Sequence, residues 1–357
     1  MEQCAMKTQI VSIGKEDTFA LTEQKLLQAG EIIKQGGLVA FPTETVYGLG
    51  GDALNPESSK KIYAAKGRPS DNPLIIHIAE LADLDKIVEE IPKKAQLLAQ
   101  AFWPGPLTII LKKAKVVPSQ TTGGLDTVAV RMPSHPIASR FIKYAGGYVA
   151  APSANRSGKP SPTMAKYVIQ DLDGRIDMIL DAEGVEIGLE STIVDLTTDV
   201  PMIVRPGYIT QEALACVVGE IDIDITIYDD HSTQAPKAPG MKYRHYAPKG
   251  ELVLVEGERE RVICYINEQI RFHRERKERT GILGTEELLA RCSADSIKSA
   301  GKENELSFVA KQLYTFLREF DDEEIDYMYA ECFSDKGLGQ AVMNRLLKAA
   351  GHKVVKV

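Results

Sequence analysis

Cysteine is scarce in this sequence, and the few cysteines follow no pairing pattern. Five occur in 357 residues, and no two form a Cys-x-x-Cys pair. They are Cys4, Cys216, Cys264, Cys292 and Cys332. An odd, scattered set argues against a disulfide framework and against a structural zinc site. It is typical of a chain kept in a reducing compartment, so we expect a cytoplasmic protein.

Long apolar runs are also missing. No stretch approaches the roughly 18–20 apolar residues that a membrane-spanning helix needs. The opening residues, MEQCAMKTQIVSIGK, lack the basic-then-apolar order of a signal peptide. We therefore expect a soluble protein that does not bind the membrane.

Several common sequence signatures are absent as well. The chain has neither the GxxxxGK[ST] loop of P-loop nucleotidases nor the GxGxxG dinucleotide fingerprint. Ser153 lacks a GxSxG context, which argues against a serine hydrolase. The formal net charge is -7, so the chain as a whole is not built to coat nucleic acid. Any anion site must come from a local group of Lys and Arg.

The chain, at 357 residues, is long enough for two domains. Helix and strand patterns alternate up to about residue 217 and predict an α/β domain around a twisted mixed sheet, 1–217. Within it we expect helices over 23–33, 58–66 and 93–102, and strands over 38–41, 73–78, 107–111, 127–131 and 147–151.

The amino-acid composition changes after the first predicted domain. Residues 218–248 contain a polar stretch broken by proline and glycine, which predicts a linker or an ordered flap. Beyond it, 249–357 reads as a smaller three-layer, Rossmann-like α/β domain. Its expected strands are 252–255, 280–283 and 325–333, and its expected helices are 259–277, 306–320 and 339–350.

The first segment that can carry chemistry is FPTETVYGLGGD, residues 41–52. The end of a predicted strand is followed by threonine hydroxyls and a glutamate carboxylate, and then by a predicted glycine-rich turn. Glycine lets a backbone approach a ligand closely, and a threonine hydroxyl can orient a small polar molecule. The same residues would also suit a strand-to-loop corner in which Thr and Glu cap the next turn.

The second segment is KGRPSDNPL, residues 66–74, with His77 just beyond it. Lys66 and Arg68 flank a glycine at the end of a predicted helix. Both can bind phosphate, the planar guanidinium of arginine through two hydrogen bonds and the ammonium of lysine as a compact charge. A solvated turn with basic residues near a helix C-terminus is the alternative. Taken alone, His77 is more simply interpreted as a hydrogen-bonded histidine in the core.

Further segments repeat the theme of small polar groups beside a cation at strand ends. Arg131 ends an apolar strand and needs an anionic partner, either a substrate carboxylate or a structural Asp or Glu. Ser153 and Asn155 follow a strand, Ser191 opens another, and Arg205 ends the next. Together these segments predict one polyanion pocket at the strand ends of a single sheet.

The order of these motifs resembles the YrdC/Sua5 family in its two-domain Sua5 type. The matching motifs are PTETVYGLG, KGRPSDNPL with its histidine, WPGPLT, TVAVRMP, APSAN, STIVD, VRPG, the linker's APGMKYRHYAP and the C-terminal GLGQAVMNRLLKAA. The resemblance covers residues 20–357. It implies a YrdC-like catalytic domain, a linker that closes over the active site, and a Sua5 C-terminal domain.

The resemblance also implies an activity, that of an L-threonylcarbamoyladenylate synthase. Such an enzyme condenses L-threonine with bicarbonate to a carbamate, which attacks the α-phosphate of ATP and yields threonylcarbamoyl-AMP and pyrophosphate. Mg²⁺ would bridge the phosphates. A separate transferase complex would then pass the threonylcarbamoyl group to adenosine 37 of tRNAs that read codons beginning with A.

Carried over motif by motif, the resemblance assigns two sets of residues. Threonine would be held by Thr45, His77, Arg131 and Ser191, with the Ala151 backbone beside them. ATP would be held by Arg68, Asn72, Thr127, Ser153, Ser161, Arg205 and the linker residue Tyr243, with Lys66 and Arg68 acting catalytically on its phosphates. We expect no protein metal ligand. Catalysis would depend on positioning and electrostatic stabilisation, since no general base can be named.

The sequence leaves two other interpretations. Carbamoyl-transferring hydrogenase-maturation proteins resemble the same module, but they carry zinc-finger-like cysteine motifs that this chain lacks. An RNA-binding module without turnover would use the basic cavity, helped by a helix with Arg271, Arg274, Arg276, Lys277 and Arg279. Glu275 and Glu278 interrupt that strip, and no RNP-type aromatic motif occurs. Weak RNA binding remains open as a secondary property.

Overall fold

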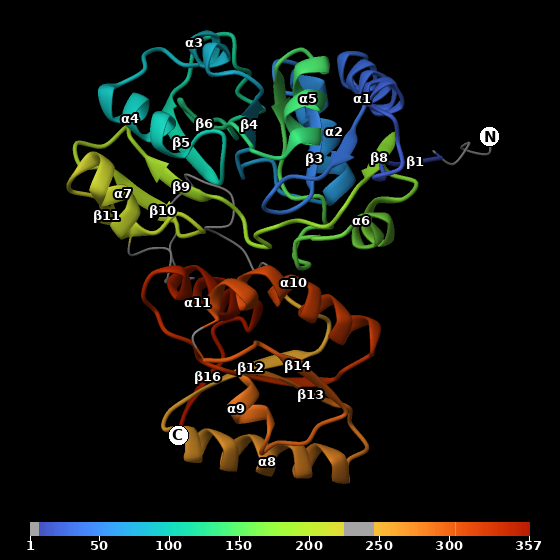
Figure 1. The fold of residues 1–357 in the computed structure, drawn as a ribbon, viewed down its shortest axis with the longest axis vertical. Helices are drawn as coiled ribbons and strands as arrows, with labels where there is room; N and C mark the ends of the chain where they lie inside the picture. The colour runs from blue at the N-terminus through green and yellow to red at the C-terminus, as the bar shows by residue number, and fades with distance from the viewer. Residues whose placement is uncertain (1–6, 225–245, 304) are drawn as a thin grey trace. The chain divides into compact units, whose positions relative to one another are not determined.

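The computed structural model describes residues 7–224, 246–303 and 305–357 (Figure 1). The described chain forms two compact units. The first takes residues up to 157, 161–186 and 190–224, and the second takes 158–160, 187–189 and 246–357. The predicted linker, 218–248, falls mostly on residues 225–245, which lie outside the described residues, as does Tyr243. None of the described helices is long and apolar enough to cross a membrane.

An 11-stranded sheet forms the middle of the first unit, in the order β1-β8-β2-β3-β7-β4-β6-β5-β9-β10-β11. Parallel and antiparallel pairs alternate irregularly along it, which confirms the predicted mixed sheet. Its strands are β1 (Gln9–Ser12), β2 (Val39–Phe41), β3 (Gly48–Asp52), β4 (Ile75–Ile78), β5 (Leu107–Lys112), β6 (Thr127–Arg131), β7 (Tyr148–Ala150), β8 (Met178–Asp181), β9 (Thr192–Asp195), β10 (Met202–Arg205) and β11 (Asp222–Ile223).

Helices cover both faces of this sheet. Strand β2 shows the division, because alternate side chains of a strand point to opposite faces. Val39 and Phe41 pack with α1 and α5, whereas Ala40 packs in a second core with α2, α4, α6 and α7. The helices are α1 (Phe19–Lys34), α2 (Pro56–Lys66), α3 (Leu84–Ile87) after the 3-10 turn η1 (Leu81–Asp83), α4 (Lys93–Phe102), α5 (Pro136–Tyr144), α6 (Ala165–Leu172) and α7 (Gln211–Val218).

The second unit has a smaller, 5-stranded sheet in the order β14-β13-β15-β12-β16. All its described strand pairs are parallel. Figure 1 shows α8 and α9 on one face and α10 and α11 on the other, which confirms the predicted three-layer, Rossmann-like arrangement. The elements are β12 (Glu251–Glu256), α8 (Arg259–Glu275), β13 (Thr280–Gly284), α9 (Glu286–Leu289), β14 (Ser296–Ser299), α10 (Leu306–Asp322), β15 (Tyr327–Glu331), α11 (Leu338–Ala349) and β16 (Val354–Lys356).

One local prediction was wrong. The glycine-rich stretch after the PTETVY motif was expected to be a turn, but Gly48–Asp52 is strand β3, antiparallel to β2. Glycine is disfavoured in strands, which is why the sequence pattern misled. Here close packing requires it, because a β-carbon on Gly50 would lie 2.8 Å from Cγ1 of Val149.

Candidate active site

Strand register brings distant candidate residues into one row across the sheet. His77 in β4 pairs with Arg131 in β6, and Arg131 pairs with Thr108 in β5. The row continues through Ile193 in β9 to Arg205 in β10, where the register shifts. Residues directly opposite one another on neighbouring strands are close neighbours on one face of a sheet. The ends of β4, β6 and β10 and the starts of β5 and β9 therefore meet at one edge.

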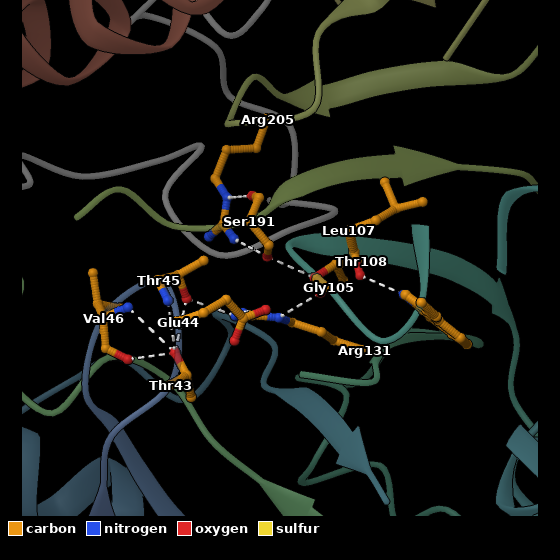
Figure 2. Close-up of polar contacts among 11 residues, drawn as sticks. Thr43, Glu44, Thr45, Val46, Gly105, Leu107, Thr108, Arg131, Ser191 and Arg205 are labelled. Atoms are coloured by element: carbon orange, nitrogen blue, oxygen red, sulfur yellow. Dashed lines mark hydrogen bonds and ion pairs between the residues drawn. The ribbon is translucent and has the colours of Figure 1, made fainter. Parts of the chain in front are cut away.

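Arg131 is the centre of the first group of contacts (Figure 2). Its Nη1 donates to Thr45 Oγ1 at 2.8 Å, and its Nε donates to the Gly105 carbonyl at 3.3 Å. Its Nη2 lies 2.7 Å from Glu44 Oε1. Arg131 and Glu44 are 4 % and 2 % exposed, so this ion pair is almost fully shielded from water. The anionic partner that sequence analysis required for Arg131 is thus present in the protein itself.

His77 is held in its neutral form. Burial, and after it the positive charge of Arg131, lower the pKa of the imidazole to about 3. Nδ1 lies 3.2 Å from the Ile75 carbonyl oxygen, a contact that fits a neutral ring with its proton on Nδ1. The opposite ring nitrogen would then be an acceptor, which can read a hydroxyl group.

Ser191 joins the row from the residue before β9. Its hydroxyl is 2.7 Å from Thr108 Oγ1, and it accepts a hydrogen bond from Arg205 Nη2 at 3.0 Å. Arg205 Nε also donates to the Ser191 carbonyl, at 3.0 Å (Figure 2). Ser161 donates to Glu190 Oε1 at 2.6 Å, which ties it to the residue next to Ser191.

A second group of contacts surrounds the KGRPSDNPL motif. Lys66 ends helix α2, is 2 % exposed, and donates to the carbonyl oxygens of Ser153 and Asn155, both at 2.5 Å. Arg68 donates to the Asn72 and Pro73 carbonyls at 3.3–3.5 Å. These hydrogen bonds to carbonyl oxygens fix the direction of both cationic side chains.

The remaining candidate site residues differ in their hydrogen-bond partners. The Ser153 hydroxyl donates to Asn155 Oδ1 at 2.5 Å, and Gly48 forms a bridge with Ser153, beside the PTETVY segment. The Ala151 N–H donates to the Ile75 carbonyl. Thr127 begins β6 opposite Lys112, and among the described residues no side-chain hydrogen bond links it to another candidate.

Sequence reasoning missed the role of Glu44. The sequence placed its carboxylate in a segment that can carry chemistry, with a turn cap as the alternative, and assigned it no partner, whereas the structure makes it the counter-ion of Arg131. The available signal was the need of a half-buried arginine for an anion. Nothing in the spacing distinguishes Glu44 from the chain's other carboxylates, because Glu44 and Arg131 are 87 positions apart and their contact depends on strand pairing.

Comparison with known proteins agrees with this arrangement. The sequence profile of the family described as telomere recombination (Sua5_yciO_yrdC) matches residues 31–207. A second, described as threonylcarbamoyl-AMP synthase, C-terminal domain, matches residues 209–351. The chain is 46% identical to the threonylcarbamoyl-AMP synthase of Bacillus subtilis, covering 98% of this chain and 100% of that protein. The chain belongs to the Sua5 family.

A solved Sua5 structure extends the likeness to three dimensions. The crystal structure of P. abyssi Sua5 complexed with L-threonine matches with a TM-score of 0.92 and 46% identity, over 98% of this chain and 100% of that one. The Pyrococcus abyssi threonylcarbamoyl-AMP synthase is 48% identical over 94% of this chain and 97% of its own length. The predicted family and fold class are therefore confirmed.

Proposed function

We propose that this Sua5 protein is an L-threonylcarbamoyladenylate synthase, a nucleotidyltransferase that uses L-threonine, bicarbonate and ATP. The observation that carries the proposal is the whole-chain similarity to Sua5 of P. abyssi, whose structure is a complex with L-threonine. The buried row of His77, Arg131 and Arg205 supports it, because these groups suit a small polar acid beside a polyanion.

The proposed reaction has two steps. The threonine ammonium and bicarbonate combine to a carbamate, releasing one water and one proton. A carbamate oxygen then attacks the α-phosphorus of ATP, and the bond from that phosphorus to the bridging oxygen breaks, so that pyrophosphate leaves. The carbamate is itself the nucleophile, so the protein needs to position the reactants and to offset their charge.

Threonine is proposed to bind at the first group of contacts. The Arg131 guanidinium would receive its carboxylate, and Thr45 and Ser191 would offer hydroxyls to its polar groups. Neutral His77 would accept a hydrogen bond from the threonine hydroxyl. A site with buried hydrogen-bonding groups rejects an analogue that leaves them unpaired. The Ala151 backbone would lie beside the ligand.

ATP is proposed to bind where the cations gather. Lys66, Arg68 and Arg205 would offset phosphate charge, and Arg68 and Lys66 would stabilise the charge that develops on pyrophosphate. Asn72, Thr127, Ser153 and Ser161 would supply hydrogen bonds to the nucleotide, and Tyr243 would close over it.

Mg²⁺ is proposed to arrive as part of MgATP. The ion keeps several water ligands and binds phosphate oxygens directly, so it needs few protein groups. Among the described residues, no group of three or more His, Cys, Asp or Glu side chains is arranged to hold a metal ion.

The product defines the proposed partners. Threonylcarbamoyl-AMP is an activated acyl adenylate that hydrolyses readily, so a transferase complex that modifies adenosine 37 of tRNA would have to consume it. We place this reaction in the cytoplasm. The free thiols Cys216, Cys264, Cys292 and Cys332 are compatible with a reducing compartment.

Pyrophosphate release tests the proposal. Purified protein is incubated with MgATP, L-threonine and bicarbonate, and each component is omitted in turn. Release should require all three. Arg68→Ala should lower kcat by about 100-fold because it removes charge stabilisation. Arg131→Ala should raise KM for threonine by about 100-fold or more. Arg175→Ala, at an exposed position of the same unit, is the matched control and should leave both constants unchanged.

A second possible result would exclude the proposed activity. ATP binding without threonine- and bicarbonate-dependent pyrophosphate would refute the synthase. If the protein then bound RNA at low salt with a steep salt dependence, the RNA-binding module would be the better description.

A further inference from the structure

Glu44 carries a buried negative charge that the proposed roles leave unused. Its side chain is 2 % exposed, and Oε1 lies 2.7 Å from Arg131 Nη2. Beyond this ion pair, neither carboxylate oxygen makes a hydrogen bond of good geometry among the described residues, although the backbone N–H groups of Glu44 and Ser134 lie nearby. A buried carboxylate normally accepts two or more hydrogen bonds, because an unsatisfied oxygen loses its hydration without compensation. A carboxylate has about four acceptor positions, so Glu44 can accept a further hydrogen bond from a bound group.

The carboxylate stays ionised in the folded protein. Burial by itself would raise its pKa, but the charge of Arg131 and the nearby backbone amides of Glu44 and Ser134 more than offset this and hold the pKa below its usual range. The group can therefore accept hydrogen bonds but donate none.

The pair of charges matches the two charges of an amino acid. At neutral pH a free amino acid carries a carboxylate and an ammonium on the same carbon. Arg131 offers a guanidinium and Glu44 an adjacent carboxylate, so the site is a neutral pair of opposite charges. Placing a zwitterion against such a pair adds no net charge to a buried site, whereas Arg131 alone would leave the ammonium desolvated and unpaired.

We propose that Glu44 binds the α-ammonium group of the amino-acid substrate, while Arg131 binds its carboxylate. This inference rests on the proposed function and adds a specificity-determining residue to it. It explains why the site would select an α-amino acid over a hydroxy acid of the same shape. The simpler reading, that Glu44 only fixes the Arg131 side chain, makes a different prediction for a ligand without an amino group.

Isothermal titration calorimetry with two ligands separates these readings. The ligands are L-threonine and (R)-3-hydroxybutyrate, which keeps the carboxylate, hydroxyl and methyl groups but lacks the amine. Wild-type protein should bind threonine at least about tenfold more tightly than the desamino acid. Glu44→Gln should weaken threonine binding by about tenfold or more. Its affinity for the desamino acid should stay within about twofold of the wild-type value. Glu183→Gln, on an exposed carboxylate, is the matched control and should change neither.

The outcomes are distinct. Equal weakening of both ligands by Glu44→Gln would mean that Glu44 only holds Arg131, and an unchanged threonine affinity would also overturn the proposal. Failure of the wild type to bind threonine would refute the proposed function instead. If Glu44→Gln does not fold, Glu44→Asp keeps the charge beside Arg131 but withdraws it by one methylene. Selective loss of threonine binding in that variant is expected, and parallel loss of both ligands would contradict the inference.

Discussion

Ser191 and Arg205 are joined by two hydrogen bonds, one from Nε to the serine carbonyl and one from Nη2 to its hydroxyl, both 3.0 Å long. The first residue is assigned to threonine and the second to ATP in the proposed function. A guanidinium held at two points by one residue has little freedom to turn. The geometry therefore links the two proposed substrate positions through a single side-chain pair.

Ser191→Ala should weaken the binding of both substrates. It removes the acceptor for Arg205 Nη2 and the partner of Thr108, while the carbonyl bond to Nε remains. Steady-state pyrophosphate release should show KM rising by about tenfold for threonine and by a smaller factor for ATP. Ser12→Ala, at an exposed position in β1, is the control. A rise confined to threonine would show that Arg205 does not depend on the serine hydroxyl.

Gly207→Ala should displace the Ser191 segment. A β-carbon at Gly207 would lie 2.5 Å from the Thr192 nitrogen and 2.8 Å from the Glu190 carbonyl oxygen, and these backbone atoms cannot turn aside as a side chain can. We expect a loss of stability of roughly 2 kcal/mol, measured by urea denaturation, and a larger proportional loss of threonine affinity. Gly124→Ala is a useful comparison, because its β-carbon would meet nothing within 4 Å, although its φ of +88° adds backbone strain. Unchanged threonine binding in a folded Gly207→Ala protein would contradict the steric argument.

The Arg131–Glu44 pair should behave as a unit in stability. Arg131→Met leaves the Glu44 carboxylate buried without its counter-charge, which costs about 3 kcal/mol or more. The double variant Arg131→Met/Glu44→Gln removes both charges and should recover at least about 1 kcal/mol of that loss. Urea denaturation of the four proteins of this cycle measures the coupling. Strictly additive losses would show that the ion pair contributes nothing to folding.

His77 should make the protein less stable in acid. Its pKa is lowered to about 3 by burial and by Arg131, whereas an unfolded histidine titrates near ~6.5. Between these values the unfolded chain binds the extra proton, so stability rises with pH and is lost as the pH falls through ~6.5. The expected loss from this residue is about 1.4 kcal/mol on going from about pH 7.5 to 5.5. His77→Gln should show a flatter dependence by that amount in chemical denaturation, and an identical slope would mean that His77 can take up a proton in the folded state.

Elements with a strong local pattern were predictable from sequence. The apolar strand over 127–131 and the helix over 93–102 have the predicted bounds. Their signals are local, because alternation or helical spacing of apolar residues and a following proline are read within a short window. By contrast, β3 could not be predicted from local sequence, because the packing that requires its Gly50 involves Val149, which is remote in sequence.

The site was predictable in its residue types but not in its pairing. Arg131, Ser191 and Arg205 could be singled out as cations and hydroxyls at strand ends, and Lys66 as a cation at a helix end. The row that aligns His77 with Arg131 depends on the register of β4 against β6, and a shift by one residue would turn His77 to the other face. The same dependence on register conceals the counter-ion Glu44.

The pairing of β1 with β8 has a consequence for how the protein is made. Gln9 lies opposite Met178 and Ser12 opposite Asp181, so the first strand cannot complete its ladder until about 170 further residues exist. At the usual ribosomal rate of 5–20 residues per second, this means a wait of roughly 10–30 s. During that interval the exposed edge of a nascent strand needs protection from wrong partners. One of the two outermost strands of the finished sheet is therefore synthesised early but can pair only late.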